Sequence, residues 1–142
     1  PRCSPLPETK WIPPAPNAPR NADIRIHVTV RMRIPARKRK EARRILGSMI
    51  ERIRLEEGCL GCRLYRDALE ESAMMLHEIW ADEKSLERHL RSQEFHSVLL
   101  VVEMASEPPE IRFDCISKTG GIEVIRDGWE RCETLPCAKQ PA

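Results

Sequence analysis

The sequence predicts a single α+β domain in which helices cover one face of an antiparallel sheet. From Ile24 to Ile34, apolar residues alternate with polar ones, as expected for a strand with one buried face. From Ala42 to Ile53, apolar residues recur at spacings of three and four, as expected for an amphipathic helix. Strand-like and helix-like periods continue along the chain and give the order β-α-β-β-α-β, which is the split βαβ plan.

The first strand and helix are bounded by residues with known end preferences. Pro35 fits the first position of a helix, because that position needs no amide donor. The helix is expected to end near Glu57, with Gly58 as its C-terminal stop. Residues 59–67 and 73–81 are strand-like and flank a polar turn, which predicts a hairpin.

Helix-capping residues and apolar runs predict the helices and strands in the second half of the domain. Asp82 is expected to cap a short helix and Ser92 a further helical stretch, because both side chains accept hydrogen bonds from backbone amides. Residues 110–117 are expected to form the last strand. Residues 122–125 are a short apolar piece that could add an edge strand.

Composition divides the chain into three parts. Residues 1–19 hold seven of the twelve prolines. Proline fixes φ and lacks an amide donor, so residues 1–22 are expected to form a flexible Pro-rich arm. Residues 23–125 are the expected domain, and residues 126–142 the expected loose C-terminal tail.

The face of the sheet without helices is expected to pair with a second copy of the chain. The first strand is polar on that face, but the later strands carry apolar residues on both faces. A homodimer through the open sheet face would bury them. His77 alternates with Met75 and Ile79, so it would lie in that interface, where its titration could make the dimer pH-sensitive.

Charge and hydropathy limit the classes of function. Residues 31–54 hold ten Arg or Lys and two Glu, which indicates either attraction for an anionic partner or a solvated helix face. RNA-binding sheets of this plan stack bases on aromatic residues, and the chain has only two Phe and one Tyr, so nucleic acid ranks last. No apolar run approaches the ~20 residues that span a bilayer, and no signal-peptide pattern opens the chain, which favours a cytoplasmic protein.

The cysteine spacing raises the question of a metal site. Cys59 and Cys62 are separated by two residues, but in an extended strand such positions point to opposite faces. Cys132 and Cys137 would complete a four-thiolate zinc site only if the tail folded back. Reduced thiols and no metal are therefore expected.

A series of short motifs points to a family. Glu57-Gly58-Cys59-Leu60 opens the second strand and Glu78-x-Trp80 ends the third, followed by Leu86-x-x-His89 and Ser92-x-x-Phe95. In this order the motifs resemble the antibiotic biosynthesis monooxygenase domain family, which includes quinol monooxygenases. The resemblance covers about residues 24–117. It implies a ferredoxin-like protomer, a dimeric α/β barrel, and a pocket between sheet and helices where oxygen reacts with a quinol or phenol without metal, flavin or other cofactor.

The resemblance also implies roles for particular residues. The catalytic residues would be His89 and Trp80. His89 would take the proton of the substrate hydroxyl or form a hydrogen bond with that hydroxyl, and the indole of Trp80 would form a wall of the pocket. Phe95 would line the cavity together with Leu76 and Leu86. The polyketide-oxidising branch has Asn and Tyr at the positions of these two leucines, so its hydrogen-bonding set is absent here.

Two functions remain open at the level of sequence. One is a cofactor-independent monooxygenase that acts on a quinol or phenolic aromatic substrate with oxygen. The other is a non-catalytic dimer that binds a small ligand or regulates a partner, with Trp80 a packing residue and His89 a hydrogen-bonded structural residue. Haem degradation is disfavoured, because Leu99 stands where that branch has its iron-binding His.

Overall fold

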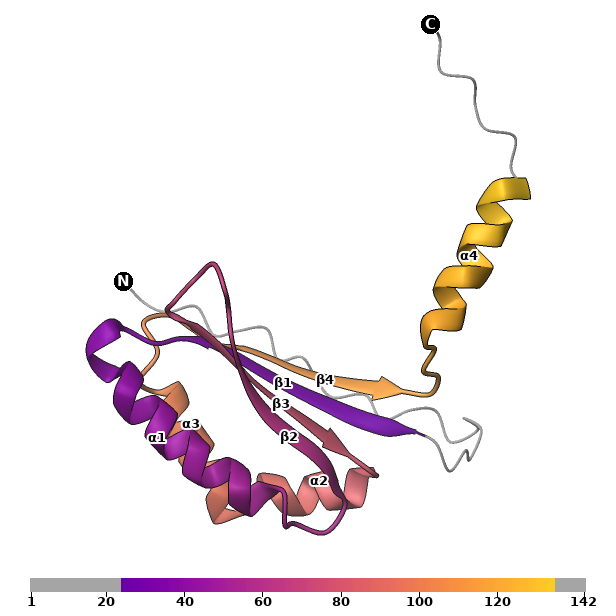
Figure 1. The fold of residues 1–142 in the computed structure, drawn as a ribbon. Helices are drawn as coiled ribbons and strands as arrows, with labels where there is room; N and C mark the ends of the chain where they lie inside the picture. Colours follow the sequence, from indigo (N-terminus) through magenta and orange to yellow (C-terminus); the bar gives the residue numbers. More distant parts are fainter. Residues whose placement is uncertain (1–23, 135–142) are drawn as a thin grey trace, which may run out of the picture.

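The computed structural model describes residues 24–134, with side chains to Gly128. The predicted Pro-rich arm and the last eight residues of the predicted tail lie outside this range. In chain order the elements are β1 (Arg25–Arg33), α1 (Ala36–Ile53), β2 (Cys59–Arg66), β3 (Ala73–Trp80), α2 (Glu83–Leu90), α3 (Gln93–Val102), β4 (Glu110–Ile116) and α4 (Ile122–Thr134). Figure 1 shows α1, α2 and α3 on one side of the sheet, while α4 stands away from them.

The four strands form one antiparallel sheet in the order β2-β3-β1-β4. In its register, Val30 of β1 lies opposite Leu76 of β3 and Ile111 of β4. The order β-α-β-β-α-β is confirmed, with two helices, α2 and α3, between the last two strands. The fold is α+β and ferredoxin-like, as predicted.

The core lies between the sheet and the helix layer. Every second residue of β1 is buried, and these side chains meet the apolar stripe of α1, as the two sequence periods predict. Each fully buried aliphatic side chain contributes about 1.5–3 kcal/mol relative to an exposed one. The residues buried from these two elements are Ile26, Val28, Val30, Met32, Ala42, Leu46, Met49, Ile50 and Ile53.

The turn after α1 differs from the prediction. The helix ends at Ile53, with Arg54 as its C-terminal cap, and not near Glu57. Gly58 follows a separate turn and adopts a φ of 84°, in the left-handed region that glycine enters without cost. A Cβ at this position would collide with the side chain of Ser85 in α2. Gly58 therefore permits close approach to α2 as well as the turn into β2.

The two predicted helix caps are confirmed. The Asp82 carboxylate accepts a hydrogen bond from the backbone amide of Ser85 at 2.8 Å, and the Ser92 hydroxyl accepts one from the amide of Phe95 at 3.1 Å. These bonds satisfy amides that have no partner within the first helical turn. They define where α2 and α3 begin, and so where the side chains of both helices meet the sheet.

The C-terminal part of the described chain contradicts one prediction. Residues 122–125 do not add an edge strand, because they begin α4, which continues to Thr134. A run of four apolar residues is too short to distinguish a strand from a helix by its period. The side chains of Ile122, Val124 and Ile125 are exposed to 60%, 58% and 65%.

The cysteine geometry also differs from the prediction in one respect. A β-bulge between Cys59 and Gly61 shifts the register, so that Cys59 and Cys62 both face the helix layer, opposite Trp80 and Glu78. Both are free thiols, and burial raises the pKa of the Cys62 thiol to about 12. Among the described residues, no group of three or more His, Cys, Asp or Glu side chains is arranged to hold a metal ion.

The positive charge of β1 is offset by acidic residues of neighbouring segments. Arg33 bonds to both Glu70 and Glu107, and Arg31 lies 3.7 Å from a carboxylate oxygen of Glu110. Within residues 24–134, no helix is long and apolar enough to cross a membrane.

Candidate functional site

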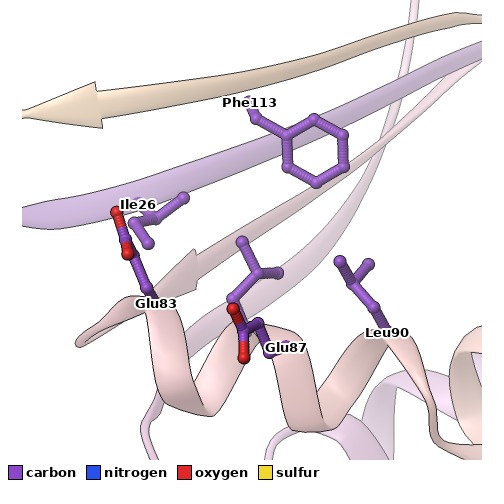
Figure 2. A pocket seen from close by; sticks show the side chains of 6 residues that line it. Ile26, Glu83, Glu87, Leu90 and Phe113 are labelled. Carbon is purple, nitrogen blue, oxygen red and sulfur yellow. The ribbon is translucent and has the colours of Figure 1, made fainter. Parts of the chain in front are cut away.

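A cavity of about 240 Å³ lies between α2 and the β1–β4 side of the sheet. Figure 2 shows Ile26 and Phe113 from the sheet and Leu90 from α2, with the carboxylates of Glu83 and Glu87 beside them. Leu86 completes the lining. The volume is below the roughly 300–1,000 Å³ of pockets for drug-sized ligands, so the cavity suits a compact, largely apolar molecule.

The cavity exists because the helix layer leaves β4 partly uncovered. The apolar residues Ile111 and Phe113 pair with the buried residues Val30 and Val28 of β1, yet each remains 41% exposed. Apolar side chains with this exposure beside a buried strand form a surface that a ligand or another chain can cover.

A buried polar network lies beside the cavity, centred on His89. The imidazole Nδ1 of His89 lies 3.0 Å from both carboxylate oxygens of Glu56, and its Nε2 lies 3.2 Å from Oε2 of Glu78. The indole N–H of Trp80 donates a hydrogen bond of 3.0 Å to the same Glu78 oxygen. His89, Glu78 and Trp80 are all buried.

Two aromatic rings enclose the imidazole. The ring of Trp80 stacks on His89 with a centroid distance of 4.5 Å, and Phe95 meets it edge-on at 5.3 Å. Aromatic contacts of these two kinds are favoured by the quadrupoles of the rings. The imidazole is thus held in one orientation by two carboxylates and two rings.

The protonation of His89 is decided by opposing effects. Burial of the imidazole lowers its pKa, but the carboxylates of Glu78 and Glu56 together outweigh burial and raise the pKa above its ordinary value. The contact between Nε2 of His89 and Glu78 is close but poorly aligned for a hydrogen bond. Among the described residues, Nε2 of His89 and Oε1 of Glu78 are buried without a hydrogen-bond partner.

The structure brings together three of the five predicted site residues. Trp80, His89 and Phe95 form one cluster, and Leu86 lines the neighbouring cavity one turn before His89 on α2. Leu76 is buried in the core and is not among the residues that line this cavity. The assignment of catalytic roles to Trp80 and His89 stays a prediction.

Sequence reasoning missed Glu56 and Glu78 as members of this cluster. Glu78 alternates with Leu76 and Trp80 in β3, so a strand with a buried face places its carboxylate in the core. A charged residue at a core position signals a paired or functional group, and that signal was available from the pattern. Glu56 lies in the turn before Gly58, and no periodic pattern in the sequence indicates its contact with His89.

Comparison with known proteins identifies the family of this fold. A family model described as antibiotic biosynthesis monooxygenase matches residues 25–99, more than half of the chain. The chain belongs to the antibiotic biosynthesis monooxygenase family. The matched residues run from β1 into α3 and contain Glu56, Glu78, Trp80 and His89, whereas β4 and α4 lie beyond the match.

One relative is similar to this protein in sequence, and two solved structures have the same fold. An uncharacterised protein from Synechocystis is 27% identical over 101 residues, which are 70% of this chain and 69% of the relative. A conserved protein from Methanosarcina mazei superimposes with a TM-score of 0.62 at 28% identity, covering 66% of this chain and 93% of the other. The protein Rv0793 from Mycobacterium tuberculosis also superimposes with a TM-score of 0.62, at 22% identity, over 68% and 99% of the two chains.

Proposed function

We propose that this member of the family is a cofactor-independent monooxygenase that oxidises a quinol or phenolic aromatic substrate with molecular oxygen. The observation that carries the proposal is the Glu56–His89–Glu78–Trp80 network beside an apolar cavity. An apolar cavity accepts a flat aromatic ring, and an oriented imidazole is the side chain best suited to exchange a proton with its hydroxyl near neutral pH.

The proposed reaction balances without a further reductant. The substrate hydroxyl loses its proton, and the resulting electron-rich ring transfers electrons to oxygen. One oxygen atom enters the ring and the other leaves as water, so that a quinol becomes a hydroxyquinone. The substrate supplies all four electrons that the oxygen molecule takes up.

His89 would act as base or hydroxyl partner and Trp80 as the flat wall against which the ring stacks. Two aliphatic side chains that line the cavity, Ile26 and Leu86, also neighbour the buried cluster, because Ile26 lies opposite Trp80 in the sheet and Leu86 lies three residues before His89 on α2. Substrate entry in this scheme moves these two aliphatic side chains and exposes the imidazole. Glu56 and Glu78 would hold His89 and keep its charge balanced when it takes up a proton.

We also propose that the protein acts as a cytoplasmic homodimer joined through the open sheet face. The buried free thiol of Cys62 suits a reducing compartment. The open face carries Met75 and Ile79 of β3 beside Tyr65 of β2, whose side chain is 43% exposed. Packing of two such faces would bury these residues.

Oxygen uptake with a reduced naphthoquinol tests the proposed activity. The wild-type protein is expected to consume oxygen faster than spontaneous autoxidation and to give a hydroxylated quinone that carries one atom of isotopically heavy oxygen gas. Trp80→Phe and His89→Gln are expected to reduce the rate at least tenfold. The matched control His96→Gln changes an exposed histidine on α3 and should leave the rate unchanged. Rates equal to autoxidation in the wild type, across quinols and phenols, would overturn the enzyme proposal.

A second candidate function is a non-catalytic binder of a small apolar ligand. It is favoured by the complete burial of His89 and Trp80, which keeps the imidazole and the indole off the cavity surface, where the polar groups are the carboxylates of Glu83 and Glu87. Calorimetric titration with a naphthalene diol distinguishes the two candidates. A binder shows saturable heat that Leu90→Trp abolishes by filling the cavity, and it shows no oxygen uptake above background.

A further inference from the structure

The groove between α2 and β4 and the helix α4 are two exposed apolar surfaces of complementary character. The groove consists of the cavity walls Leu90 and Phe113, its acidic rim Glu87, and the adjoining exposed side chain of Ile111. On α4, Ile122 and Ile125 are three residues apart and lie on one helix face, exposed to 60% and 65%. Neither surface is covered within one copy of the described chain.

The charged residues at the borders of α4 and of the groove are opposite in sign. Arg126 follows Ile125 and lies four residues after Ile122, so it borders the apolar face of α4. Glu87 borders the groove, and neither side chain takes part in an ion pair among the described residues. An apolar helix face with an arginine at its border is complementary to an apolar groove with a carboxylate at its border.

The position of α4 indicates which copy it covers. Figure 1 shows α4 leaving the end of β4 on the side of the sheet away from α1, α2 and α3, whereas the groove lies on the helix side. Residues 117–121 and the 13 residues of α4 can together span roughly 35 Å, well beyond the ~10 Å between packed sheets. The helix is thus placed to reach a neighbouring copy.

We propose that α4 of one copy docks in the α2–β4 groove of a second copy, with Ile122 and Ile125 on Phe113 and Leu90 and Arg126 beside Glu87. When α4 docks in this way, a helix from the partner closes the open side of the cavity. The docking helix α4 and the strand β4 lie outside the segment that matches the family, whereas α2 lies within it. This inference does not depend on the proposed chemistry, because a binder and an enzyme would both contain the closed cavity.

Hydrogen exchange on the full chain tests the docking. In the wild type, the amides of α2 and β4 are expected to exchange slowly, and the double substitution Ile122→Asp, Ile125→Asp should accelerate their exchange at least tenfold. The matched control is Val124→Asp, which places the same charge at a similarly exposed position on the opposite face of α4. Unchanged exchange in the double variant, or equal acceleration in the control, would overturn the proposal.

Reversing the charge of one contact residue in each of two variants distinguishes docking on a second copy from docking on the same copy. Glu87→Arg and Arg126→Glu each place like charges at the contact, so each variant alone should show fast exchange in α2 and β4. A mixture of the two variants forms pairs in which both contacts are again opposite in charge, and protection should return. Fast exchange that persists after mixing would show that α4 folds back on its own chain and would overturn docking on a second copy.

Discussion

Nε2 of His89 lies 3.2 Å from Oε2 of Glu78, and both side chains are buried in the core of the domain. A buried carboxylate is costly to keep charged unless a cation or hydrogen-bond donors accompany it. Here the imidazole supplies the cation when it is protonated, and the indole N–H of Trp80 supplies a donor. The pair therefore links the stability of the fold to the protonation of His89.

Glu78→Gln is expected to lower the pKa of His89, because it removes the carboxylate that contributes most to the raised value. It also leaves one member of a buried pair without its counter-charge, so the free energy of unfolding should fall by roughly 3 kcal/mol. Imidazole chemical shifts against pH and urea unfolding measure the two effects. Glu57→Gln is the control, since that carboxylate is 84% exposed and should change stability by no more than about 0.5 kcal/mol. An unchanged His89 titration in Glu78→Gln would contradict the assignment.

The stability of the fold is expected to depend on pH through His89. Its folded-state pKa lies above the unfolded value of about 6.5, so the proton binds more tightly to the folded chain. The stabilisation is complete below the unfolded pKa and is lost as pH rises through the raised folded pKa. Unfolding free energies measured at a series of pH values should show this loss in the wild type. His89→Gln should flatten the profile in that window, and a slope that survives in this variant would point to another group.

The histidine pair on the open sheet face, His27 and His77, should make the stability of the fold depend on pH in the opposite direction to His89. Nδ1 of His27 lies 3.0 Å from Nε2 of His77, a contact in which one nitrogen must be unprotonated. Burial, followed by the charges of His27 and Arg63, lowers the pKa of His77. Stability should therefore fall as pH drops below about 6.5, until His77 in the folded chain is protonated as well.

The proposed dimer should share this dependence on His77, because the pair lies on the face through which two copies would join. Sedimentation velocity at neutral and mildly acidic pH is expected to show dissociation of the wild type on acidification. His77→Gln should remain dimeric across the range, and His96→Gln, a change on the exposed side of α3, should behave as the wild type. Dissociation of all three proteins at the same pH would exclude His77 as the sensor.

Two glycines provide a matched test of the turn before β2. Gly58→Ala should destabilise the fold by at least about 1 kcal/mol, because its φ of 84° is unfavourable for alanine and the added Cβ would meet Ser85. Gly47→Ala adds the same atom in the middle of α1, where no atom lies within 4 Å apart from the neighbouring residues and backbone of α1 itself, and should stabilise by about 0.5–1 kcal/mol. Thermal and urea unfolding measure both. Equal effects of the two substitutions would show that the left-handed turn is not constrained.

Much of the fold could be predicted from local pattern. Alternation along residues 24–34 identified β1 and its buried face, and the spacing of apolar residues identified α1. Asp82 and Ser92 were identified as caps because the capping bond joins residues only three apart in the chain. Each of these features depends on neighbours in sequence, where side-chain period and backbone hydrogen bonding act directly.

Only part of the candidate site could be predicted from local sequence patterns. Short motifs pointed to Trp80, His89 and Phe95, which the fold does bring together, but not to the carboxylate of Glu56, which lies 33 positions before His89 in the chain. Nor did the pattern show that β4 would remain uncovered beside α2, leaving a cavity at Phe113.

The sequence by itself thus determined the order of the elements, which faces are apolar, and where two helices begin. Only the tertiary structure decided that His89 is buried between two carboxylates and two rings, and that a cavity lined by Ile26 and Leu86 forms between α2 and β4. The reason is physical. Periodicity and capping depend on residues within about one helical turn, whereas burial, pKa and cavities depend on which distant segments pack together.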